Sequence, residues 1–205
     1  MNWDIASHTG LEVADVIAPL ADLRIRVFAE WPYLYAGTAE YEQSYLQAYV
    51  DCPRSLAIVV RDGKTVIGAS TGLPLADAPA EMQQPFLQAG EDLQQMFYCA
   101  ESVVLPAYRG QGLGREFFRR REAHARSLGL TESVFCAVDR SATDPRRPAH
   151  YQGNSAFWTR RGYAPAPQHR CQFAWTDIGR THSSIKTLSF WRKTLSADTA
   201  SSAAC

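Results

Sequence analysis

Several features that would place the sequence in a special class of protein are missing. The 21 basic and 21 acidic residues cancel, so the formal net charge is zero and favours neither nucleic acid nor an anionic membrane as a partner. No apolar run reaches the roughly 18 residues of a membrane-spanning helix, and the first residues lack the pattern of a secretory signal. The sequence therefore predicts a cytoplasmic protein.

Residues that form disulfides or metal sites are also few. The cysteines are odd in number, scattered and without a Cys-x-x-Cys pair, which favours reduced thiols over a disulfide framework or a zinc site. They are Cys52, Cys99, Cys136, Cys171 and Cys205. The five histidines lack the spacing of metal ligands, so we expect no metal.

What is present is typical of an ordinary globular chain. The 205 residues are 46% hydrophobic and 20% charged, which is enough for one well-cored domain and too short for two comfortable ones. We predict a single domain over residues 1–195. The small, polar tail 196–205 is predicted to be disordered.

Hydrophobic periodicity and turn residues predict the order of the elements. We expect, in sequence, a strand at 2–8, helices at 11–28 and 38–50, strands at 55–60 and 65–71, a proline-punctuated excursion with one or two short helices at 73–95, a strand at 96–105, a helix at 112–128, a strand at 133–138, a loop at 139–153, a short helix from 154 or 155, and strands at 170–176 and 185–195.

The stretch ESVVLPAYRGQGLGR, from Glu101 to Arg115, organises the chain. A β-branched strand is stopped by Pro106, and three glycines at alternate positions precede a helix. Exposed amides at a helix N-terminus form an anion site, and such a loop suits a diphosphate.

Two common glycine loops do not fit this stretch. No lysine follows Gly114, as a P-loop requires, and the glycine spacing departs from Gly-x-Gly-x-x-Gly of dinucleotide-binding proteins. The pattern Arg/Gln-x-x-Gly-x-Gly/Ala fits at Arg109, Gly112 and Gly114. It resembles the acyl-CoA pyrophosphate loop of the GNAT superfamily of N-acetyltransferases.

The predicted order of elements is also similar to the GNAT order over nearly the whole chain. The resemblance implies an α/β (α+β) fold with a mixed, mostly antiparallel central sheet flanked by helices. It implies an enzyme that transfers an acetyl group from acetyl-CoA, as cosubstrate, to a primary amine by direct attack in a ternary complex. The acceptor, a small molecule or a peptide, is not identified by the sequence, and a homodimer paired through terminal strands is one open arrangement.

Site residues follow from matching the motif. The resemblance assigns the pyrophosphate to the loop main chain and the pantetheine arm to the end of the preceding strand and to the last short helix. The expected cofactor-binding residues are Val103, Val104, Leu105, Arg109, Gly110, Gln111, Gly112, Leu113, Gly114, Arg115, Asn154 and Trp158.

Glu101, the only carboxylate on the central strand, is the candidate base, because burying it carries a desolvation cost that a function would explain. Its alternative is a charge that reaches solvent or a nearby arginine. Regular alternation places Tyr98 on the opposite face of the strand, unless a bulge intervenes. Tyr98 is nevertheless counted among the candidate catalytic residues. The family's usual acid is a tyrosine where this chain has Trp158. Tyr151 and Tyr163 are nearby substitutes, although Tyr163 more plausibly begins a strand as a core aromatic, and a thiolate can also leave unaided.

Two other functions stay open at this stage. The first is a non-catalytic acyl-CoA-binding sensor or interaction module, which the Trp158 departure favours slightly. The second is a dinucleotide-binding protein, which the glycine spacing disfavours. The arginines on the helix at 112–128 are expected to form a solvated face paired with Glu116 and Glu122, with Arg115 alone near the phosphates.

Overall fold

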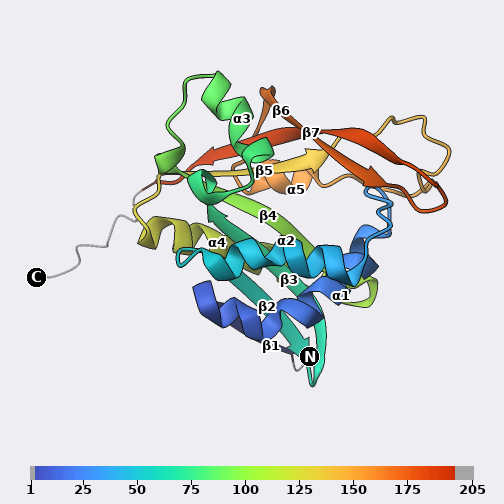
Figure 1. Ribbon diagram of the computed structural model, residues 1–205, viewed down its shortest axis with the longest axis horizontal. Coiled ribbons are helices and arrows are strands. Elements are labelled where there is room, and N and C mark those ends of the chain that lie inside the picture. Colours follow the sequence, from blue (N-terminus) through green and yellow to red (C-terminus); the bar gives the residue numbers. More distant parts are fainter. Residues whose placement is uncertain (1–2, 197–205) are drawn as a thin grey trace, which may run out of the picture.

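The computed structural model describes residues 3–196, which form one α/β unit around a seven-stranded sheet (Figure 1). The strands are β1 (Trp3–His8), β2 (Leu56–Asp62), β3 (Thr65–Pro74), β4 (Met96–Val104), β5 (Glu132–Val138), β6 (Ala164–Thr176) and β7 (Ser183–Thr194). The helices are α1 (Ile17–Phe28), α2 (Ala39–Asp51), α3 (Ala80–Gln88), α4 (Leu113–Ser127) and α5 (Ser155–Arg160), with 3₁₀ turns η1 (Gly10–Val16), η2 (Leu75–Asp77), η3 (Leu93–Gln95) and η4 (Pro106–Tyr108).

The strand order is β1-β2-β3-β4-β5-β7-β6. All neighbours are antiparallel except β4 and β5, which run parallel because α4 crosses between them. This arrangement confirms the predicted mixed, mostly antiparallel sheet flanked by helices.

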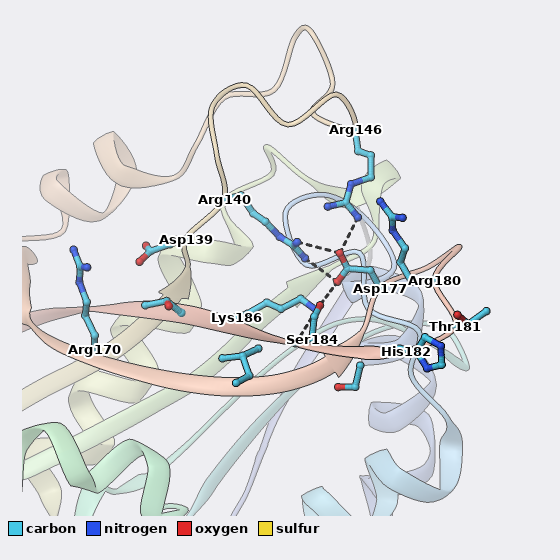
Figure 2. A pocket seen from close by; sticks show the side chains of 13 residues that line it. Asp139, Arg140, Arg146, Arg170, Asp177, Arg180, Thr181, His182, Ser184 and Lys186 are labelled. Carbon is cyan, nitrogen blue, oxygen red and sulfur yellow. Dashed lines mark hydrogen bonds and ion pairs between the residues drawn. The ribbon is translucent and has the colours of Figure 1, made fainter.

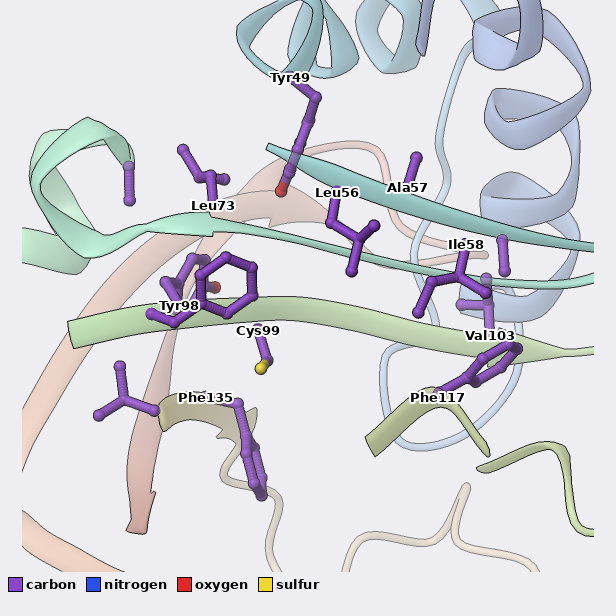
Figure 3. Packing of buried hydrophobic residues seen from close by; sticks show 14 of the residues in the cluster. Tyr49, Leu56, Ala57, Ile58, Leu73, Tyr98, Cys99, Val103, Phe117 and Phe135 are labelled. Atoms are coloured by element: carbon purple, nitrogen blue, oxygen red, sulfur yellow. The ribbon is translucent and has the colours of Figure 1, made fainter. Parts of the chain in front are cut away.

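Helices cover both faces of the sheet (Figure 1). On one face, α1 packs over β3 and β4 and α2 packs against α1, and Figure 3 shows Tyr49 pointing from α2 toward the strands. On the other face lies α4, whose Phe117 is fully buried. Near the β6 edge, α3 buries Phe86 against Phe190 of β7, with their ring centroids 4.9 Å apart. The hydrophobic core is therefore divided between two layers, one on each side of the sheet.

Element boundaries agree with the sequence prediction within a few residues, with two larger differences. The single helix predicted at 11–28 is divided into the 3₁₀ turn η1 and the helix α1, which begins at Ile17. The last hairpin begins at Ala164 instead of residue 170, because the register of β6 against β7 shifts between Ala166 and Arg170. Such a shift interrupts the alternation of side chains on which strand prediction depends.

Two further observations concern the ends of the chain and its helices. The tail predicted to be disordered lies, from residue 197 on, outside the described residues. Among the helices of residues 3–196, none combines the length and apolarity that crossing a membrane requires.

Candidate active site

The two parallel strands at the centre of the sheet separate partway along their length. β4 pairs with β5 only from Met96 to Tyr98, opposite Glu132 to Val134. Beyond that point β4 stays with β3 up to Val104, and β5 stays with β7 up to Val138. The edge of β4 that faces β5 therefore carries main-chain groups without a strand partner in the described chain.

A bulge in β4 lies at the start of this split. Glu101 is opposite Thr71 of β3 but Cys99 is opposite Gly72, so Ala100 is the extra residue. The extra residue reverses the alternation and places Tyr98 and Glu101 on the same face, the one covered by α1 and α2. Tyr45 of α2 confirms this arrangement, since it lies within electrostatic reach of both Tyr98 and Glu101.

The Glu101 carboxylate is buried in an ion-pair cluster. Its Oε2 lies 2.5 Å from Nη1 of Arg24 on α1, and Arg24 also contacts the buried Glu42 of α2. Burial opposes the charge on Arg24, but the two carboxylates and Tyr45 outweigh it and raise the pKa of Arg24 well above its ordinary value. Two carboxylates therefore share one cation, and Oε1 of Glu101 is buried without a hydrogen-bond partner in the described chain.

The main chain of Glu101 is held from the opposite face of the sheet. Its carbonyl accepts hydrogen bonds from Ser70 Oγ at 2.7 Å and from Arg121 Nη1 at 3.1 Å. The same Arg121 nitrogen donates to Ser70 and Ser102, both at 2.9 Å. Glu101 is thus fixed through its side chain by α1 and through its backbone by α4.

Arg121 corrects the prediction that this helix presents a solvated basic face. Its side chain is buried, and its hydrogen bonds to hydroxyl and carbonyl groups at the β3–β4 junction offset the burial of the charge. The ion pairs expected along the helix are confirmed: Glu116 pairs with Arg119 and Arg120, and Glu122 pairs with Arg126. Glu122, however, is buried and lies closer to Lys193, at 2.7 Å.

The glycine loop connects the end of β4 to α4. Gly110 has φ 76° and Gly112 has φ 91°, a left-handed conformation that favours glycine. Gly112 is the N-cap of α4, no side chain caps the helix, and the first intrahelical acceptor is the Gly112 carbonyl, bonded by Glu116 N at 3.2 Å. The amides of Leu113 and Gly114 therefore have no helical acceptor and make this helix end an anion site.

The remaining residues of the loop have structural contacts of their own. Arg109 turns back, donating from Nε to the Val104 carbonyl at 3.0 Å and pairing with Glu30 at 2.8 Å. Gln111 donates to the Ala107 carbonyl at 3.2 Å. A Cβ on Gly114 would lie 3.4 Å from the ring of Phe157, so this glycine also permits the close approach of α4 and α5.

Arg115 lies at the first turn of α4 beside Gly112, and it lines a cavity of about 440 Å³. The same cavity is lined by Trp3, Asp4, Ile5, Gln111, Gly112, Glu116 and Arg120. Both acidic and basic side chains line this cavity, which lies against β1 on the outer side of the glycine loop.

Val103, Val104 and Leu105 differ in which neighbours their main chains face. The Leu105 amide donates to the Ile67 carbonyl of β3 at 2.9 Å, and its carbonyl accepts from Tyr108 N at 2.9 Å. Because bonded and non-bonded pairs alternate along an antiparallel ladder, Val103 also faces β3, whereas Ser102 and Val104 face the split. The amides of Ser102 and Val104 are therefore the ones directed toward β5.

The tyrosine candidates lie on the same side of the sheet as Glu101. Tyr98 is buried, its hydroxyl lies 3.5 Å from Cys136 Sγ, and burial raises its pKa. Tyr151 is half-buried with its ring edge-on to Trp31 at 6.1 Å, and burial raises its pKa as well. Both groups are accordingly protonated at neutral pH.

Tyr33, in the loop after α1, lies near these groups. Burial raises its pKa, and Glu101, Cys136 and Tyr151 all lie within electrostatic reach of its hydroxyl. Its ring stacks on Trp175 of β6 at 6.1 Å, and Nε1 of that tryptophan donates to the Tyr33 carbonyl at 3.1 Å.

The last short helix borders the split on the α4 side. Asn154 occupies the N-cap of α5, but its side chain makes no capping bond and is exposed. Trp158 is half-buried, with its ring edge-on to Phe135 at 5.0 Å and to Trp191 at 5.1 Å. Tyr163, by contrast, is a core residue whose hydroxyl contacts Ser133 Oγ at 2.6 Å, as expected of a core aromatic.

Arg24 and Glu42 were not identified from the sequence as site residues. A signal was present, since Arg24 stands next to the apolar Leu23 within the core-facing periodicity of α1. Glu42 precedes Leu46 and Tyr49 at helical spacing. A charged residue at an apolar position in each of two adjacent helices predicts a buried pair.

Comparisons with known proteins agree with this architecture. The sequence model of the acetyltransferase (GNAT) family matches residues 23–152, more than half of the chain. No curated protein matches the chain by sequence.

Several solved structures share the fold. They include yncA from Salmonella typhimurium with its cofactor acetyl-CoA (15% identity, 100% of both chains, TM-score 0.57). An acetyltransferase from Thermus thermophilus is similar over 95% of this chain and 98% of its own (18% identity, TM-score 0.55). The paia N-acetyltransferase from Thermoplasma acidophilum, in complex with coenzyme A, is similar over 95% and 99% (12% identity, TM-score 0.54).

The family match begins in α1 and ends in the loop after β5, so it includes Arg24, the bulge at Ala100 and the glycine loop. The structural likeness extends the same fold to both ends of the described chain. The chain belongs to the GNAT acetyltransferase family and is therefore an acyltransferase.

Proposed function

We propose that the protein transfers an acetyl group from acetyl-CoA to the primary amine of a small molecule or peptide, by direct attack in a ternary complex. The observation that carries the proposal is the uncapped N-terminus of α4 at the wide end of the β4–β5 split. The free amides of Leu113 and Gly114 and the positive end of the helix dipole suit the pyrophosphate. Arg115 is the nearest side-chain cation on this helix.

The pantetheine arm would lie along the open edge of β4. The main-chain amides of Ser102 and Val104 face the split and would bond the arm in the manner of an added strand, while the Val104 carbonyl is already bonded by Arg109. Asn154, whose side chain is exposed and makes no capping bond, and Trp158 would border the arm from α5. Val103 and Leu105 would contribute by shaping the edge, since their main chains face β3.

The reaction forms a C–N bond and breaks a C–S bond. The amine nitrogen attacks the thioester carbonyl carbon, and a β4 amide stabilises the developing oxyanion. Glu101 would take a proton from the amine through its partnerless Oε1, directly or through water, while Arg24 holds Oε2. The departing thiolate takes its proton from Tyr98, Tyr151 or solvent.

Direct attack predicts that both substrates are bound together. Initial rates should give intersecting double-reciprocal lines, and Cys136→Ala should keep acetyl transfer. Cys136 is the thiol to test, because a hydrogen bond from the Cys171 thiol lowers the pKa of Cys136 although burial opposes this. Parallel lines, or loss of transfer in a correctly folded Cys136→Ala variant, would establish a covalent acyl-cysteine step instead.

A glycine substitution tests the cofactor loop. Gly112→Trp places an indole at the helix N-terminus and should abolish acetyl-CoA binding and amine-dependent release of CoA. Gly129→Trp is the matched control, since Gly129 has φ 75°, follows the other end of α4 and has nothing within 4 Å of its Cβ position. Equal effects of the two substitutions would show that backbone strain, not the phosphate site, is responsible.

Two other sequence predictions remain part of the proposal. We propose a cytoplasmic location and a homodimer paired through terminal strands. Analytical ultracentrifugation of the purified chain tests the second, with a monomer as the contrary result.

A further inference from the structure

Ser102 carries an exposed hydroxyl in the middle of a buried strand. Among the nine residues of β4, all of which the structure describes, Ser102 alone is exposed, and Glu101 and Val103 on either side of it are buried. On one side β3 still pairs with Ser102 through Ser70, whereas on the other side β5 has left β4 after Tyr98. The Ser102 hydroxyl is therefore open to solvent through the split.

This hydroxyl and the candidate base lie on opposite faces of the sheet. Successive side chains of a strand alternate, so Ser102 points to the face of α4 and Glu101 to the face of α1. The uncapped start of α4 and Trp158 of α5 border the split on the Ser102 face. A cofactor bound there would present its thioester to the split from the Ser102 side, while the base acts from the other side.

Arg121, which orients this hydroxyl, is a buried cation without an anionic partner. Its side chain makes no ion pair with the residues that the structure describes, and its Nε is buried without a hydrogen-bond partner among them. Nη1 donates to Ser102 Oγ and Ser70 Oγ, both at 2.9 Å, and the guanidinium lies over the ring of Phe118 at 4.7 Å. Buried charges are ordinarily paired, so the positive field of Arg121 is available to an anion that forms in the split.

The hydroxyl hydrogens at this junction differ in how they are used. Ser70 Oγ donates its only hydrogen to the Glu101 carbonyl at 2.7 Å. In the 3.1 Å contact between the two serine hydroxyls, the hydrogen therefore comes from Ser102. Ser70 Oγ also accepts from Arg121, so it keeps a donor when the Ser102 hydrogen turns away. Ser102 can thus donate into the split without leaving a buried group unsatisfied.

The charge of Arg121 already acts on a sulfur atom of this face. Cys99 is buried on β4 and shares the face of Ser102, because the extra residue Ala100 lies between them. Burial raises the pKa of the Cys99 thiol, and the charge of Arg121 opposes this rise. Arg121 therefore favours a thiolate over a thiol at this end of the split.

We propose that the Ser102 hydroxyl, oriented by Arg121, donates a hydrogen bond to the sulfur of CoA as the C–S bond breaks. It would take the place of the tyrosine that the family has where this chain has Trp158. The electron pair of the broken bond goes to sulfur, the hydrogen stays on Ser102, and the thiolate takes its proton from solvent as CoA is released. Ser102 touches the leaving group and is catalytic, whereas Arg121 is a positioning residue. The inference rests on the proposed acetyl transfer, but binding of CoA tests it without an acceptor.

The first experiment measures binding of the product alone. CoA and desulfo-CoA, which lacks the thiol, are titrated calorimetrically into the full chain between about pH 7 and about pH 9.5. A free thiol ionises near about pH 8.5, so CoA should gain at least about tenfold in affinity relative to desulfo-CoA across this range. Ser102→Ala should remove this thiol-specific gain, and Ser102→Thr, which keeps the hydroxyl, should retain it.

Ser7→Ala is the matched control for this experiment. Ser7 is an exposed strand serine that also accepts a hydrogen bond from an arginine of α4, Arg120, at 3.1 Å, but it lies on β1 away from the split. The control should keep the gain of the wild type. Arg121→Lys keeps the charge but loses the fork that reaches both serines, and it should reduce the gain.

The second experiment measures turnover with acetyl-CoA. Ser102→Ala should lower kcat by about 10–100-fold, because the hydrogen bond strengthens only as charge develops on sulfur. The KM for acetyl-CoA should stay unchanged, since the main chain of Ser102 is retained. Ser102→Thr and Ser7→Ala should both keep the kcat of the wild type.

The outcomes separate the inference from the proposed function. A Ser102→Ala enzyme with the kcat and the pH-dependent CoA binding of the wild type overturns the role of Ser102 and leaves acetyl transfer intact. Equal weakening of CoA and desulfo-CoA also overturns it, because the side chain would then only shape the site. A thiol-specific gain that Ser102→Ala removes, in a chain that acetylates no amine, overturns the acetyl transfer and leaves the thiolate site. Arg121→Lys with the full gain overturns the role of Arg121.

Discussion

Arg24 contacts two buried carboxylates at once, those of Glu42 and Glu101, beside the split between β4 and β5. Removing one partner from a buried ion pair costs about 3–5 kcal/mol, because the other charge is left unpaired in a low-dielectric interior. The pair also fixes which oxygen of Glu101 faces a substrate. Stability and catalysis therefore depend on the same three side chains.

Arg24→Met should lower the free energy of unfolding by about 3–5 kcal/mol, since Glu42 and Glu101 would both lose their cation. Urea denaturation followed by tryptophan fluorescence measures the change. Adding Glu42→Gln to this variant should restore part of the loss, because one unpaired carboxylate is removed. Strictly additive losses would contradict the account of a shared cation.

Glu101→Gln should lower kcat by about 10²–10⁴-fold, the contribution of a positioned general base, with the KM for acetyl-CoA unchanged. Glu81→Gln, on the exposed side of α3, is the control and should keep full activity. A Glu101→Gln enzyme with the kcat of the wild type would show that Glu101 serves only the ion pair.

At the scale of elements, Asp177 holds the turn end of the β6–β7 hairpin to the rest of the molecule (Figure 2). The residue contacts cations from the loop after β5 and from β7, and it forms a β-bridge with Tyr35. Burial opposes its ionisation, but hydrogen bonds from Arg140, Arg146 and Lys186 outweigh this and hold the pKa of Asp177 well below its ordinary value.

A lowered folded-state pKa means that Asp177 contributes stability above the ordinary aspartate pKa, about 3.9, and loses it as pH falls toward the folded-state value. Asp177→Asn should therefore lower the free energy of unfolding by about 3 kcal/mol at pH 7. The difference should stay constant down to about pH 5 and shrink below about pH 4. Asp22→Asn, at an exposed position of α1, should show no such pH-dependent difference, and a gap that widens at low pH would contradict the sign.

The elements also show what the sequence can and cannot predict. The glycine loop was predictable, because Pro106 and the positive-φ glycines Gly110 and Gly112 mark a turn directly before a helix. The bulge at Ala100 was not, since neither glycine nor proline marks it and the register of β3 determines it. Its position decides that Tyr98 and Glu101 share a face.

At the scale of the whole molecule, the order of strands and helices along the chain follows from local periodicity, and the structure confirms it. The ion-pair clusters could not be predicted in the same way. Arg24, Glu42 and Glu101 come from three separate elements, and the two arginines that contact Asp177 lie 31 and 37 residues from it in the chain. Such contacts arise only when the sheet brings its edges and covering helices together.

The whole fold brings the uncapped end of α4 and the candidate base to one split in the sheet. Glu101 is held by α1 through its side chain and by α4 through its carbonyl.

The most direct test of the central claim is a calorimetric titration of the purified chain with acetyl-CoA, repeated with NADH and with the Gly112→Trp variant. We predict saturable binding of acetyl-CoA on the micromolar scale, no binding of NADH, and loss of acetyl-CoA binding in the variant. No heat with acetyl-CoA in the correctly folded wild type would contradict the account, since Arg109 to Gly114 would then be only a turn.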